Sequence, residues 1–498
     1  MVRRCVQPAV ILGDKLTSRA RKLLAGAGLL SLLVALTLIG SPSGHPAVAQ
    51  AAVSSTTPIK HVVVIYQENN SFDAVLGATC AVRTTKCDGY TGTVTLKDGT
   101  SVAMHKAPDV VPIVNHNEAT QVTAVNGGKM NGWAQISGCA APAYACLAYW
   151  TPSQIPNLSA LATKFAVSDR TFSMEDSPSW GGHIYVASAT LDGFVGDNPY
   201  KAGDTTVGPG WGCDSKKVVH WRDSAGKMSG QPACVPDYTL DPVKYPYGGP
   251  YKATKAAPMK TIFDLFDAAG GVYRLYGAPP PDSYTGTNKL VGYPWAICPS
   301  FASCFYTNQR NSMVKSTQVL DDAANGTLPD YAVVTASNFS QKLMGGMKTS
   351  QHNGESMLNG DNWIGRVVSA IQNGPNWDST AIFITYDDCG CFYEHVPPGT
   401  NPDNSRQGPR EPMVIVSPYA KAGYTDSTPA SFASILAYVE HNFGLPALTA
   451  NDAGAYDYAN SFDYNQVPLG GAKLTQHAVS RATIEYLRTH PTDDDDPT

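Results

Sequence analysis

The sequence predicts an α/β fold in which a mainly parallel central sheet is flanked by helices on both faces and carries loop-rich excursions pinned by disulfides. Short β-branched apolar runs alternate with amphipathic helical segments, which is the order typical of parallel sheets. The 498 residues are enough for one large domain of this kind. The 45 glycines and 36 prolines, together with cysteines in sequence-local pairs, indicate long ordered loops between the elements.

Residues 1–50 are predicted to be a secretory signal peptide. Basic residues, including Arg3 and Arg4, precede an apolar run from Leu23 to Ile39, and small residues follow it. A retained membrane anchor is the alternative. The run is only just near spanning length and is rich in glycine and alanine, so cleavage is favoured. The chain is therefore expected to be secreted or held at the cell surface.

Cysteine usage agrees with export. Of the 11 cysteines, Cys5 lies in the predicted signal, and the other ten form an even set of neighbours along the chain. A zinc site is a weaker alternative, because no two pairs have the compact ligand spacing of a zinc ribbon. A disulfide between Cys389 and Cys391 would close a tight ring. The expected disulfides are Cys80–Cys87, Cys139–Cys146, Cys213–Cys234, Cys298–Cys304 and Cys389–Cys391.

The chain after the signal is expected to form one domain over residues 51–485. A segment at about 193–258, rich in glycine, proline, tyrosine and tryptophan, is predicted to be a cap-like insertion. Residues 486–498 end in acidic side chains and are expected to be a disordered tail. The net charge of −5 and the 15% share of charged residues leave no basic face, so no nucleic-acid partner is expected.

The apolar pattern gives the order of the elements. The run from Ile59 to Tyr66 predicts a strand buried on both faces, and polar residues end it abruptly. Residues of about 77–156 form a loop-rich region. Further strands are expected at 167–172, 271–276, 330–337, 380–386 and 412–417, and helices at 156–165, 183–189, 261–269, 361–372 and 431–443.

Paired oxygen ligands follow two of these strands. Glu68 and Asn69 come directly after the first strand, and Asp387 and Asp388 follow the strand at 380–386. Ligands of open α/β sheets bind beyond the carboxyl ends of the strands. Adjacent carboxylates there are costly unless a cation neutralises them, so a hard ion such as Ca²⁺, Mg²⁺ or Mn²⁺ is expected. The alternatives are a plain polar turn after the first strand and two solvated carboxylates after the second.

A serine precedes the helix expected at 183–189. Ser179 lies in a Ser-Pro-Ser-Trp-Gly-Gly-His turn, where a helix N-terminus would assist its deprotonation and bind a phosphoryl group. Serine at such a position is more commonly a helix N-cap, and the sequence alone does not separate the two. Histidines in polar settings and one lysine in a Gly-Gly-Lys segment are candidates for proton transfer or phosphate binding: His116, His183, His352, His395 and Lys129.

Motifs spread from about residue 59 to 445 carry a resemblance to a known family. The chain resembles the bacterial phosphoesterase family that contains phosphatidylcholine-preferring phospholipases C and an acid phosphatase, within the alkaline-phosphatase-like superfamily. The shared order of the motifs is the specific signal. The matching segments are Glu68-Asn69-Asn70-Ser71-Phe72-Asp73, Asn126 to Trp133, Ser177-Pro178-Ser179-Trp180-Gly181-Gly182-His183, Thr385 to Val396 and Gly408 to Pro412.

The resemblance implies an alkaline-phosphatase-like fold and a role for each matching position. One divalent ion, with Ca²⁺, Mg²⁺, Mn²⁺ and Zn²⁺ all open, would be bound by Glu68, Asn69, Asp387 and Asp388. Ser179 would attack phosphorus and form a phosphoserine that water then hydrolyses. His116, His352 and His395 would surround the phosphate as catalytic groups. Independently of the resemblance, His183 and Lys129 are expected to bind the substrate.

The chain departs from the family pattern inside these motifs. Asn70 stands where arginine is usual, and Asp388 stands where glutamate is usual. Cys391 replaces a glycine. Gly181 and Gly182 replace a Pro-Asn pair in the serine turn. That replacement keeps Ser177 open as an alternative nucleophile.

The expected function is that of a secreted, metal-dependent phosphoric ester hydrolase of the phospholipase C or acid phosphatase type. Its substrate would be a phosphate monoester or a phospholipid. The alternative is a non-catalytic secreted protein of the same fold that binds phosphorylated or sugar ligands, an idea motivated by the departures around Ser179. An assay for turnover of a chromogenic phosphate ester distinguishes the hydrolase from the non-catalytic protein.

Overall fold

The computed structural model describes residues 53–174, 177–201, 211–213, 215, 217–223, 225–241, 243–244, 259–277, 297–336 and 347–492. The predicted signal at 1–50, the last residues of the predicted tail and parts of the predicted insertion lie outside these residues. None of the helices in the described ranges is both long enough and apolar enough to cross a membrane.

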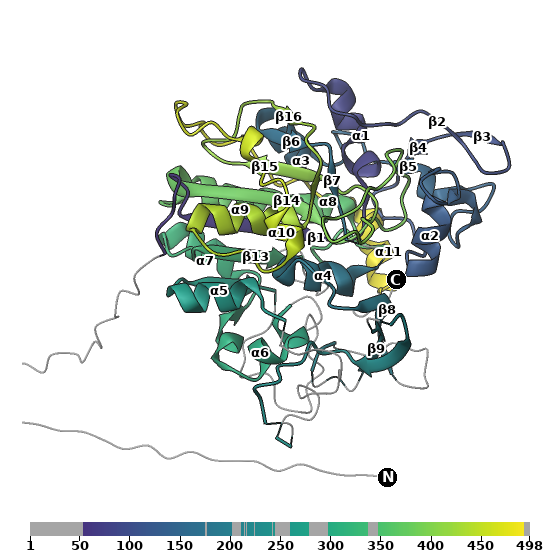
Figure 1. The fold of residues 1–498 in the computed structure, drawn as a ribbon. Coiled ribbons are helices and arrows are strands. Elements are labelled where there is room, and N and C mark those ends of the chain that lie inside the picture. Colours follow the sequence, from purple (N-terminus) through teal and green to yellow (C-terminus); the bar gives the residue numbers. More distant parts are fainter. Residues whose placement is uncertain are drawn as a thin grey trace, which may run out of the picture. The chain divides into compact units, whose positions relative to one another are not determined.

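The core of the chain is a central sheet of eight strands (Figure 1). β1 lies inside the sheet and pairs in parallel with both β13 and β14. β15 runs antiparallel to its neighbours β14 and β6. The predicted mainly parallel sheet is therefore confirmed. The strand order is β12 (Met313–Val314), β11 (Tyr273–Tyr276), β13 (Tyr331–Thr335), β1 (His61–Gln67), β14 (Thr380–Tyr386), β15 (Met413–Val416), β6 (Ala166–Ser168) and β16 (Thr425–Asp426).

The strands could be predicted because helices cover the sheet on both faces, which makes their sequences continuously apolar. Every residue of β13, β14 and β15 is buried, and in β1 only His61 is partly exposed. The strand predicted at 380–386 has these same bounds in the structure. The strand predicted at 167–172 is divided, because β7 (Thr171–Phe172) leaves the central sheet and pairs with β17 (Ala430–Ser431).

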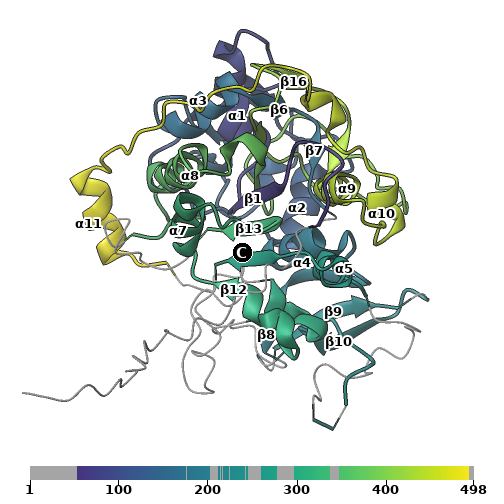
Figure 2. The same cartoon turned by 90° about the vertical axis from the view of Figure 1, so that its left-hand side faces the viewer.

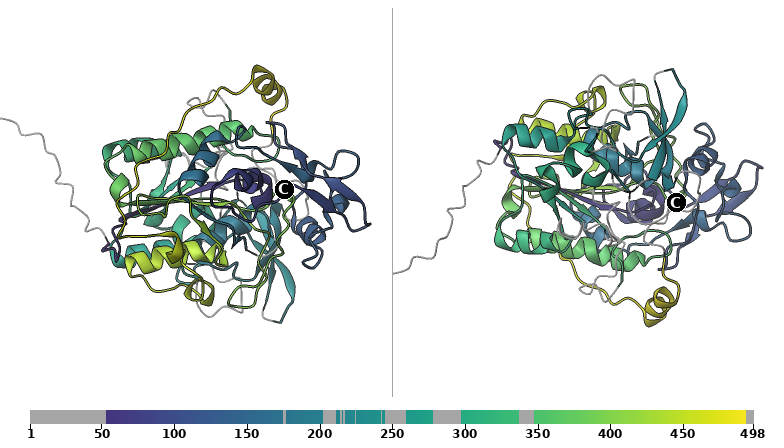
Figure 3. Two further views of the ribbon diagram at one scale, coloured as in Figure 1. Left: turned by 90° about the horizontal axis from the view of Figure 1, so that it is seen from above. Right: turned by 90° about the horizontal axis from the view of Figure 1, so that it is seen from below.

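Two helix layers enclose the sheet (Figures 2 and 3). One face carries α3 (Pro156–Lys164), α7 (Gln318–Asn325) and α8 (Met357–Gln372), and the other carries α4 (Ser179–Ser188), α5 (Ile262–Ala269) and α9 (Ala433–Phe443). The remaining α-helices of the described residues are α1 (Phe72–Val82), α2 (Glu118–Val125), α6 (Ala302–Phe305), α10 (Ala450–Ala453) and α11 (Arg481–Thr489).

The helix predicted at 183–189 begins at Ser179 in the structure, and two further predicted boundaries are wrong for identifiable reasons. α8 begins at Met357 rather than at 361, because the side chain of Ser356 accepts a hydrogen bond from the Asn359 amide and caps the helix. α11 continues to Thr489, so the tail predicted from residue 486 begins inside a helix. Ser480 caps that helix through the amide of Thr483.

Smaller sheets lie outside the central one. β8 (Phe194–Lys201), β9 (Lys217–Arg222) and β10 (Met228–Pro232) form an antiparallel sheet in the region of the predicted insertion. Two further pairs of strands lie in the loop-rich region, which is drawn in dark blue at the right of the left panel of Figure 3. They are β2 (Thr93–Thr95) with β3 (Ser101–Ala103), and β4 (His105–Lys106) with β5 (Ala148–Tyr149).

The disulfides are local, as predicted. Four of the five expected pairs are bonded: Cys80–Cys87, Cys139–Cys146, Cys213–Cys234 and Cys298–Cys304. The fifth prediction is wrong, because Cys389 and Cys391 are buried thiols that no disulfide joins. One residue separates these two cysteines, and so short a ring is far from the relaxed geometry of a disulfide.

Candidate active site

The carboxyl ends of β1 and β14 place the four expected metal ligands together. The two strands run in parallel register up to Gln67 opposite Tyr386. Glu68 and Asn69 therefore leave the sheet beside Asp387 and Asp388. The backbone amide of Asn69 donates to Asp387 Oδ1 over 2.9 Å. All four residues are buried, so the alternative of solvated loop carboxylates is wrong.

The side chain of Asn69 connects the two strand ends to the serine turn. Its φ of 56° lies in the left-handed region, which asparagine tolerates better than most residues. Its Nδ2 atom lies 3.1 Å from Asp388 Oδ2, 3.3 Å from Ser179 Oγ and 2.6 Å from His116 Nε2. One amide thus contacts a carboxylate, a hydroxyl and an imidazole.

Ser179 is the first residue of α4, and its side chain does not cap the helix. The N-cap is Pro178. The Oγ atom of Ser179 instead donates to Asp388 Oδ2 over 3.2 Å. The N-cap interpretation of this serine is therefore wrong. The hydroxyl of Ser177 donates to the carbonyl of Gly196 over 3.2 Å, on a different side of the turn.

Two glycines allow the site to be packed this closely. A Cβ atom at Gly182 would lie 2.5 Å from the carbonyl oxygen of Asp387, and one at Gly390 would lie 2.0 Å from that of Asn69. Both distances are far inside van der Waals contact with backbone, which cannot easily give way. The departure from the family pattern at Gly182 therefore lets α4 approach the strand end directly.

Several buried oxygens at the two strand ends have no hydrogen-bond partner among the described residues. They are both carboxylate oxygens of Glu68, Oδ2 of Asp387 and Oδ1 of Asn69. Buried polar atoms in proteins are nearly always paired. Glu68 and Asp387 each offer an oxygen to a group of ligand atoms that lie within 4.8 Å of one another, and a divalent cation would satisfy such carboxylate oxygens. The residues present therefore fit the expected metal.

His183 lies with these ligands rather than with a substrate group. Its Nε2 atom is 3.6 Å from Glu68 Oε1 and 3.8 Å from Asp387 Oδ2. The ligand atoms of the three residues all lie within 4.8 Å of one another. The prediction of His183 as a substrate-binding residue thus changes to that of a metal-ligand candidate. A histidine among the donors keeps Zn²⁺ in the set of possible ions.

Burial and like charge shift the pKa values of this cluster. Burial and the charge of Asp387 raise the pKa of Glu68 well above its usual range. Burial, with a contribution from Asp388, raises the pKa of Asp387 to about 6, and burial raises that of Asp388 to about 7. Burial lowers the pKa of His183 to about 3, so its imidazole is neutral and able to bind a metal.

A histidine pair lies on the other side of Asn69. Nε2 of His116 lies 2.6 Å from Nδ2 of Asn69, while its Nδ1 lies 3.0 Å from the carbonyl oxygen of Val114 and 3.2 Å from Nδ2 of Asn353. The rings of His116 and His352 are 5.7 Å apart between centroids and meet edge to face. The structure therefore places His116 against Asn69, which contacts Ser179, and places His352 against the ring of His116.

Asn70 helps to hold this pair in place. Its amide donates to the carbonyl of Glu68 and to that of Gln351, both over 3.1 Å. The second bond links the end of β1 to the segment that carries His352. The arginine usual at this position is thus replaced by two neutral hydrogen bonds.

His395 and Lys129 are not brought to the site. His395 belongs to an ion-pair cluster in which its Nδ1 lies 2.7 Å from Asp73 and its Nε2 3.1 Å from Asp88. Buried Arg410 pairs with Asp73 and Glu394 in the same cluster. No hydrogen bond or ion pair between described residues joins His395 to Ser179, and Lys129 is exposed in the turn after α2. The geometry therefore does not support a catalytic role for His395.

The ion-pair cluster predicts a pH-dependent contribution of His395 to stability. Burial lowers the pKa of His395, but the hydrogen bond and charge of Asp73 and the charge of Glu394 outweigh this and raise it above 6.5. A raised histidine pKa adds stability that is complete below the unfolded-state pKa and is lost as the pH rises through the folded-state pKa. His395→Gln should therefore cost about 1–2 kcal/mol near pH 5.5 and clearly less near pH 9.

Urea unfolding of both proteins at the two pH values measures this difference. His441→Gln is the matched control. His441 also pairs with an aspartate, Asp457, but its side chain is 61% exposed. A cost of His395→Gln that does not change with pH would contradict the raised pKa.

One buried carboxylate near the site was missed in the sequence. Glu411, which precedes β15, is buried. Burial raises its pKa well above the usual range, and Cys389, Asp388 and Asp387 add to the shift. Glu411 precedes its strand, whereas Glu68 follows β1. Because β15 runs antiparallel to β14, the start of β15 lies at the same edge of the sheet as the end of β14.

The sequence matches the model of the Phosphoesterase family over residues 59–446. The chain therefore belongs to the Phosphoesterase family, and the prediction of a phosphoric ester hydrolase is confirmed at the level of the family. It is similar to the non-specific phospholipase C1 of Arabidopsis thaliana, with 26% identity over 82% of this chain and 72% of that protein. It is also similar to a non-hemolytic phospholipase C of Burkholderia pseudomallei, with 23% identity over 77% of this chain and 55% of that protein.

A solved structure of a protein in the alkaline phosphatase superfamily from Vibrio parahaemolyticus is also similar. Its sequence is 12% identical, the match covers 81% of this chain and 72% of that protein, and the TM-score is 0.35. The chain spans only 55–72% of the length of the two phospholipases C.

Proposed function

We propose that the chain is an exported, metal-dependent phosphoric ester hydrolase of the phospholipase C or acid phosphatase type with Ser179 as nucleophile. The observation that carries the proposal is the contact of Ser179 Oγ with Asp388 at the edge of a carboxylate cluster with unpaired buried oxygens. The family match and the similarity to phospholipases C support the reaction class.

In the proposed reaction, Asp388 accepts the proton of Ser179 through the hydrogen bond between Oδ2 and Oγ. Oγ attacks phosphorus, an O–P bond forms, and the P–O bond to the alcohol breaks. The alcohol leaves with the proton that Ser179 gave up. Water then splits the phosphoserine, releases the phosphate product and returns a proton to Ser179.

Groups on both sides of Ser179 would hold the phosphoryl oxygens. His116 and His352 would contact them from one side, positioned by Asn69 and Asn70. On the other side, Glu68, Asn69, Asp387, Asp388 and His183 would hold one divalent ion. When bound, that ion would offset the negative charge of the phosphoryl group and favour the ionised serine.

Export is the second part of the proposal. Four disulfides within the described residues suit an oxidising compartment. The signal predicted at 1–50 would direct the chain there. A size shift between precursor and secreted protein, and the N-terminal sequence of the secreted form, test this part.

Two chromogenic esters test the reaction, namely p-nitrophenyl phosphate and p-nitrophenyl phosphorylcholine. At least one should be turned over, EDTA should abolish the activity, and a divalent ion should restore it. Absence of turnover with Ca²⁺, Mg²⁺, Mn²⁺ and Zn²⁺ would contradict the proposal. Phosphate binding without turnover would instead support the non-catalytic alternative.

A further inference from the structure

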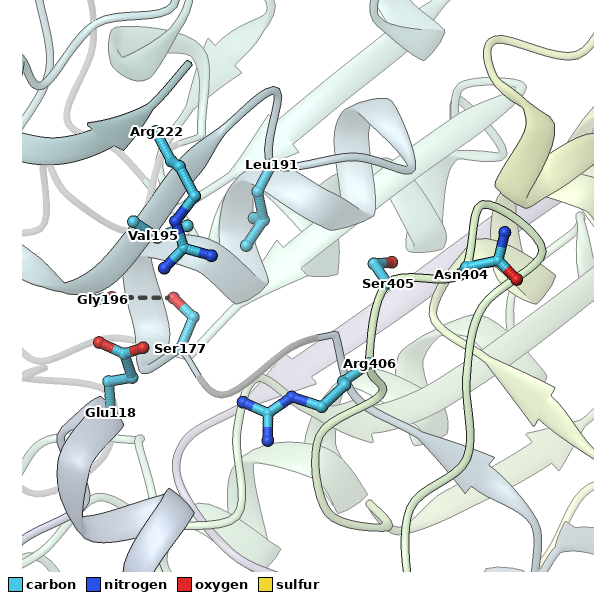
Figure 4. Close-up of a pocket in the computed structure, with 9 residues that line it drawn as sticks. All are labelled: Glu118, Ser177, Leu191, Val195, Gly196, Arg222, Asn404, Ser405 and Arg406. Carbon is cyan, nitrogen blue, oxygen red and sulfur yellow. Dashed lines mark hydrogen bonds between the residues drawn. The ribbon is translucent and has the colours of Figure 1, made fainter. Parts of the chain in front are cut away.

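Strand β8 holds the serine turn on both sides of Ser179. The hydroxyl of Ser177 donates to the carbonyl of Gly196 over 3.2 Å (Figure 4). The backbone amide of Trp180 donates to Oδ1 of Asn198 over 2.9 Å. Gly196 and Asn198 both belong to β8. One strand therefore contacts the residue directly after Ser179 and the residue two positions before it.

Asn198 supplies the hydrogen bond of a helix N-cap to α4 from a different element. The N-cap residue itself is Pro178, whose side chain has no hydrogen-bond acceptor. An N-cap side chain normally accepts from the amide of the second or third helical residue, and asparagine is among the best residues for this. Trp180 is the second residue of α4, and its amide meets the side-chain oxygen of Asn198. β8 thus caps the helix that begins at Ser179.

The first turn of α4 needs this support because it contains two glycines. Glycine is the least favourable residue in a helix after proline, since its backbone loses the most freedom there. Close packing accounts for both glycines: a Cβ at Gly182 would lie 2.5 Å from the carbonyl oxygen of Asp387, and one at Gly181 would lie 2.2 Å from Oγ of Ser177. The turn that carries Ser179 is therefore weak on its own.

The side chain of Trp180 fixes the turn against a further segment. Its Nε1 donates to Oγ of Ser300 over 3.0 Å, and its ring meets Phe194 of β8 edge to face, with 5.1 Å between centroids. Trp180, Asn198 and Ser300 are each at most 3% exposed, so water does not compete for these hydrogen bonds. The segment of Ser300 is itself closed by the Cys298–Cys304 disulfide. The residue after Ser179 is thus held by its amide, its indole N–H and its ring.

The contacts of Ser179 itself are long. Its Oγ lies 3.2 Å from Oδ2 of Asp388 and 3.3 Å from Nδ2 of Asn69, whereas well-formed hydrogen bonds of these kinds are about 2.7–3.0 Å long. Contacts of this length hold Oγ only loosely, so its position depends on the backbone of the turn. A displacement of a reacting atom by about 1 Å can slow a reaction about 100-fold.

We propose that Asn198 and Ser300 are positioning residues for the nucleophile, which they hold in place through Trp180. The inference rests on the proposed function, since it takes Ser179 as the group that attacks phosphorus. It adds β8 and the Cys298–Cys304 segment to the parts of the chain on which the rate of the reaction depends.

Asn198→Leu tests the cap, because it removes the acceptor and keeps the approximate volume of the side chain. With the chromogenic ester that the wild type hydrolyses, kcat should fall about tenfold and KM should change less than about twofold, since the turn is loosened while the groups that bind phosphate remain. Asn198→Asp keeps an oxygen in the same place and should retain kcat within about threefold of wild type. Equal losses in the two variants, or a wild-type kcat in Asn198→Leu, would overturn the inference.

Trp180→Phe and Ser300→Ala test the second contact. Each variant breaks the hydrogen bond between Nε1 and Oγ, and each should lower kcat about threefold. The double variant should lose no more than either single variant, because the two changes remove the same bond. Losses that multiply in the double variant would show that Ser300 does not act through Trp180.

Asn451→Leu is the matched control. Asn451 is also buried and donates to the carbonyl of Ala189, the C-cap of α4. This change should lower the melting temperature as Asn198→Leu does, but leave kcat within about twofold of wild type. An equal loss of kcat in the control would assign the effect to the stability of the whole helix and contradict a positioning role for Asn198.

Hydrogen exchange distinguishes failure of this inference from failure of the proposed function. Peptides that cover residues 178–188 should exchange faster in Asn198→Leu than in wild type, because the first turn of α4 opens more often. If the wild type hydrolyses neither chromogenic ester, the hydrolase proposal fails, and faster exchange in the variant would still support the cap. Unchanged exchange would overturn the inference and leave the hydrolase proposal intact.

Discussion

Ser179→Ala is expected to lower kcat/KM for p-nitrophenyl phosphate by about 10⁴-fold or more, the size of loss seen when an enzyme nucleophile is removed. Ser179 is the serine whose hydroxyl contacts both Asn69 and Asp388. Removing Oγ removes the atom that attacks phosphorus. The remaining groups would still bind phosphate, so KM should change less than kcat.

Two further serines make the test specific. Ser188→Ala is the matched control, because Ser188 is buried in the same helix and donates to the carbonyl of Ile184. It should keep the activity while changing the same helix. If Ser177→Ala abolished turnover and Ser179→Ala did not, the nucleophile would be Ser177. Acid quenching during turnover, followed by mass spectrometry, should locate phosphate on the peptide that carries Ser179.

The strands and the polar residues that follow them could be predicted because both signals lie in short, continuous stretches of sequence. β14 is a run of apolar residues buried on both faces, and its end is marked by two aspartates. A parallel sheet then brings these aspartates next to Glu68 and Asn69 without further information. The start of α8 was missed because its first turn buries a polar residue. Asn359 is buried there and donates to the carbonyl of Lys348, which apolar periodicity does not reveal.

The groups that the histidine side chains contact could be predicted only in part. His183 lies one helical turn after Ser179 in α4, and the i, i+4 spacing places both on one face of a helix. That spacing would have placed His183 with the metal ligands if the helix had been predicted to start at Ser179. No such signal existed for His395, because Asp73, Asp88 and Arg410 come from distant parts of the chain. Its partners depend on the fold as a whole.

Glu68→Gln is expected to weaken binding of the divalent ion by on the order of 100-fold and to lower activity in parallel at limiting metal. The substitution keeps the shape of the side chain and removes its charge. Both carboxylate oxygens of Glu68 are buried without a hydrogen-bond partner in the described part of the chain, so an ion is the partner that they would lose. Glu485→Gln is the matched control, because that carboxylate is 62% exposed on α11. Metal titration followed by calorimetry measures the affinity of each variant.

The same substitution should change stability with opposite signs in the two states. In metal-free protein, Glu68 is a buried carboxyl beside Asp387 and its pKa is raised, so replacing it with neutral glutamine should stabilise the fold by about 1–3 kcal/mol. With the ion present, the wild type gains binding free energy that the variant lacks, and the order should reverse. Thermal unfolding with EDTA and with excess metal tests this reversal. A Glu68→Gln protein that is less stable than wild type in EDTA, or that binds the ion as tightly, would show that Glu68 is held by protein contacts rather than by a metal.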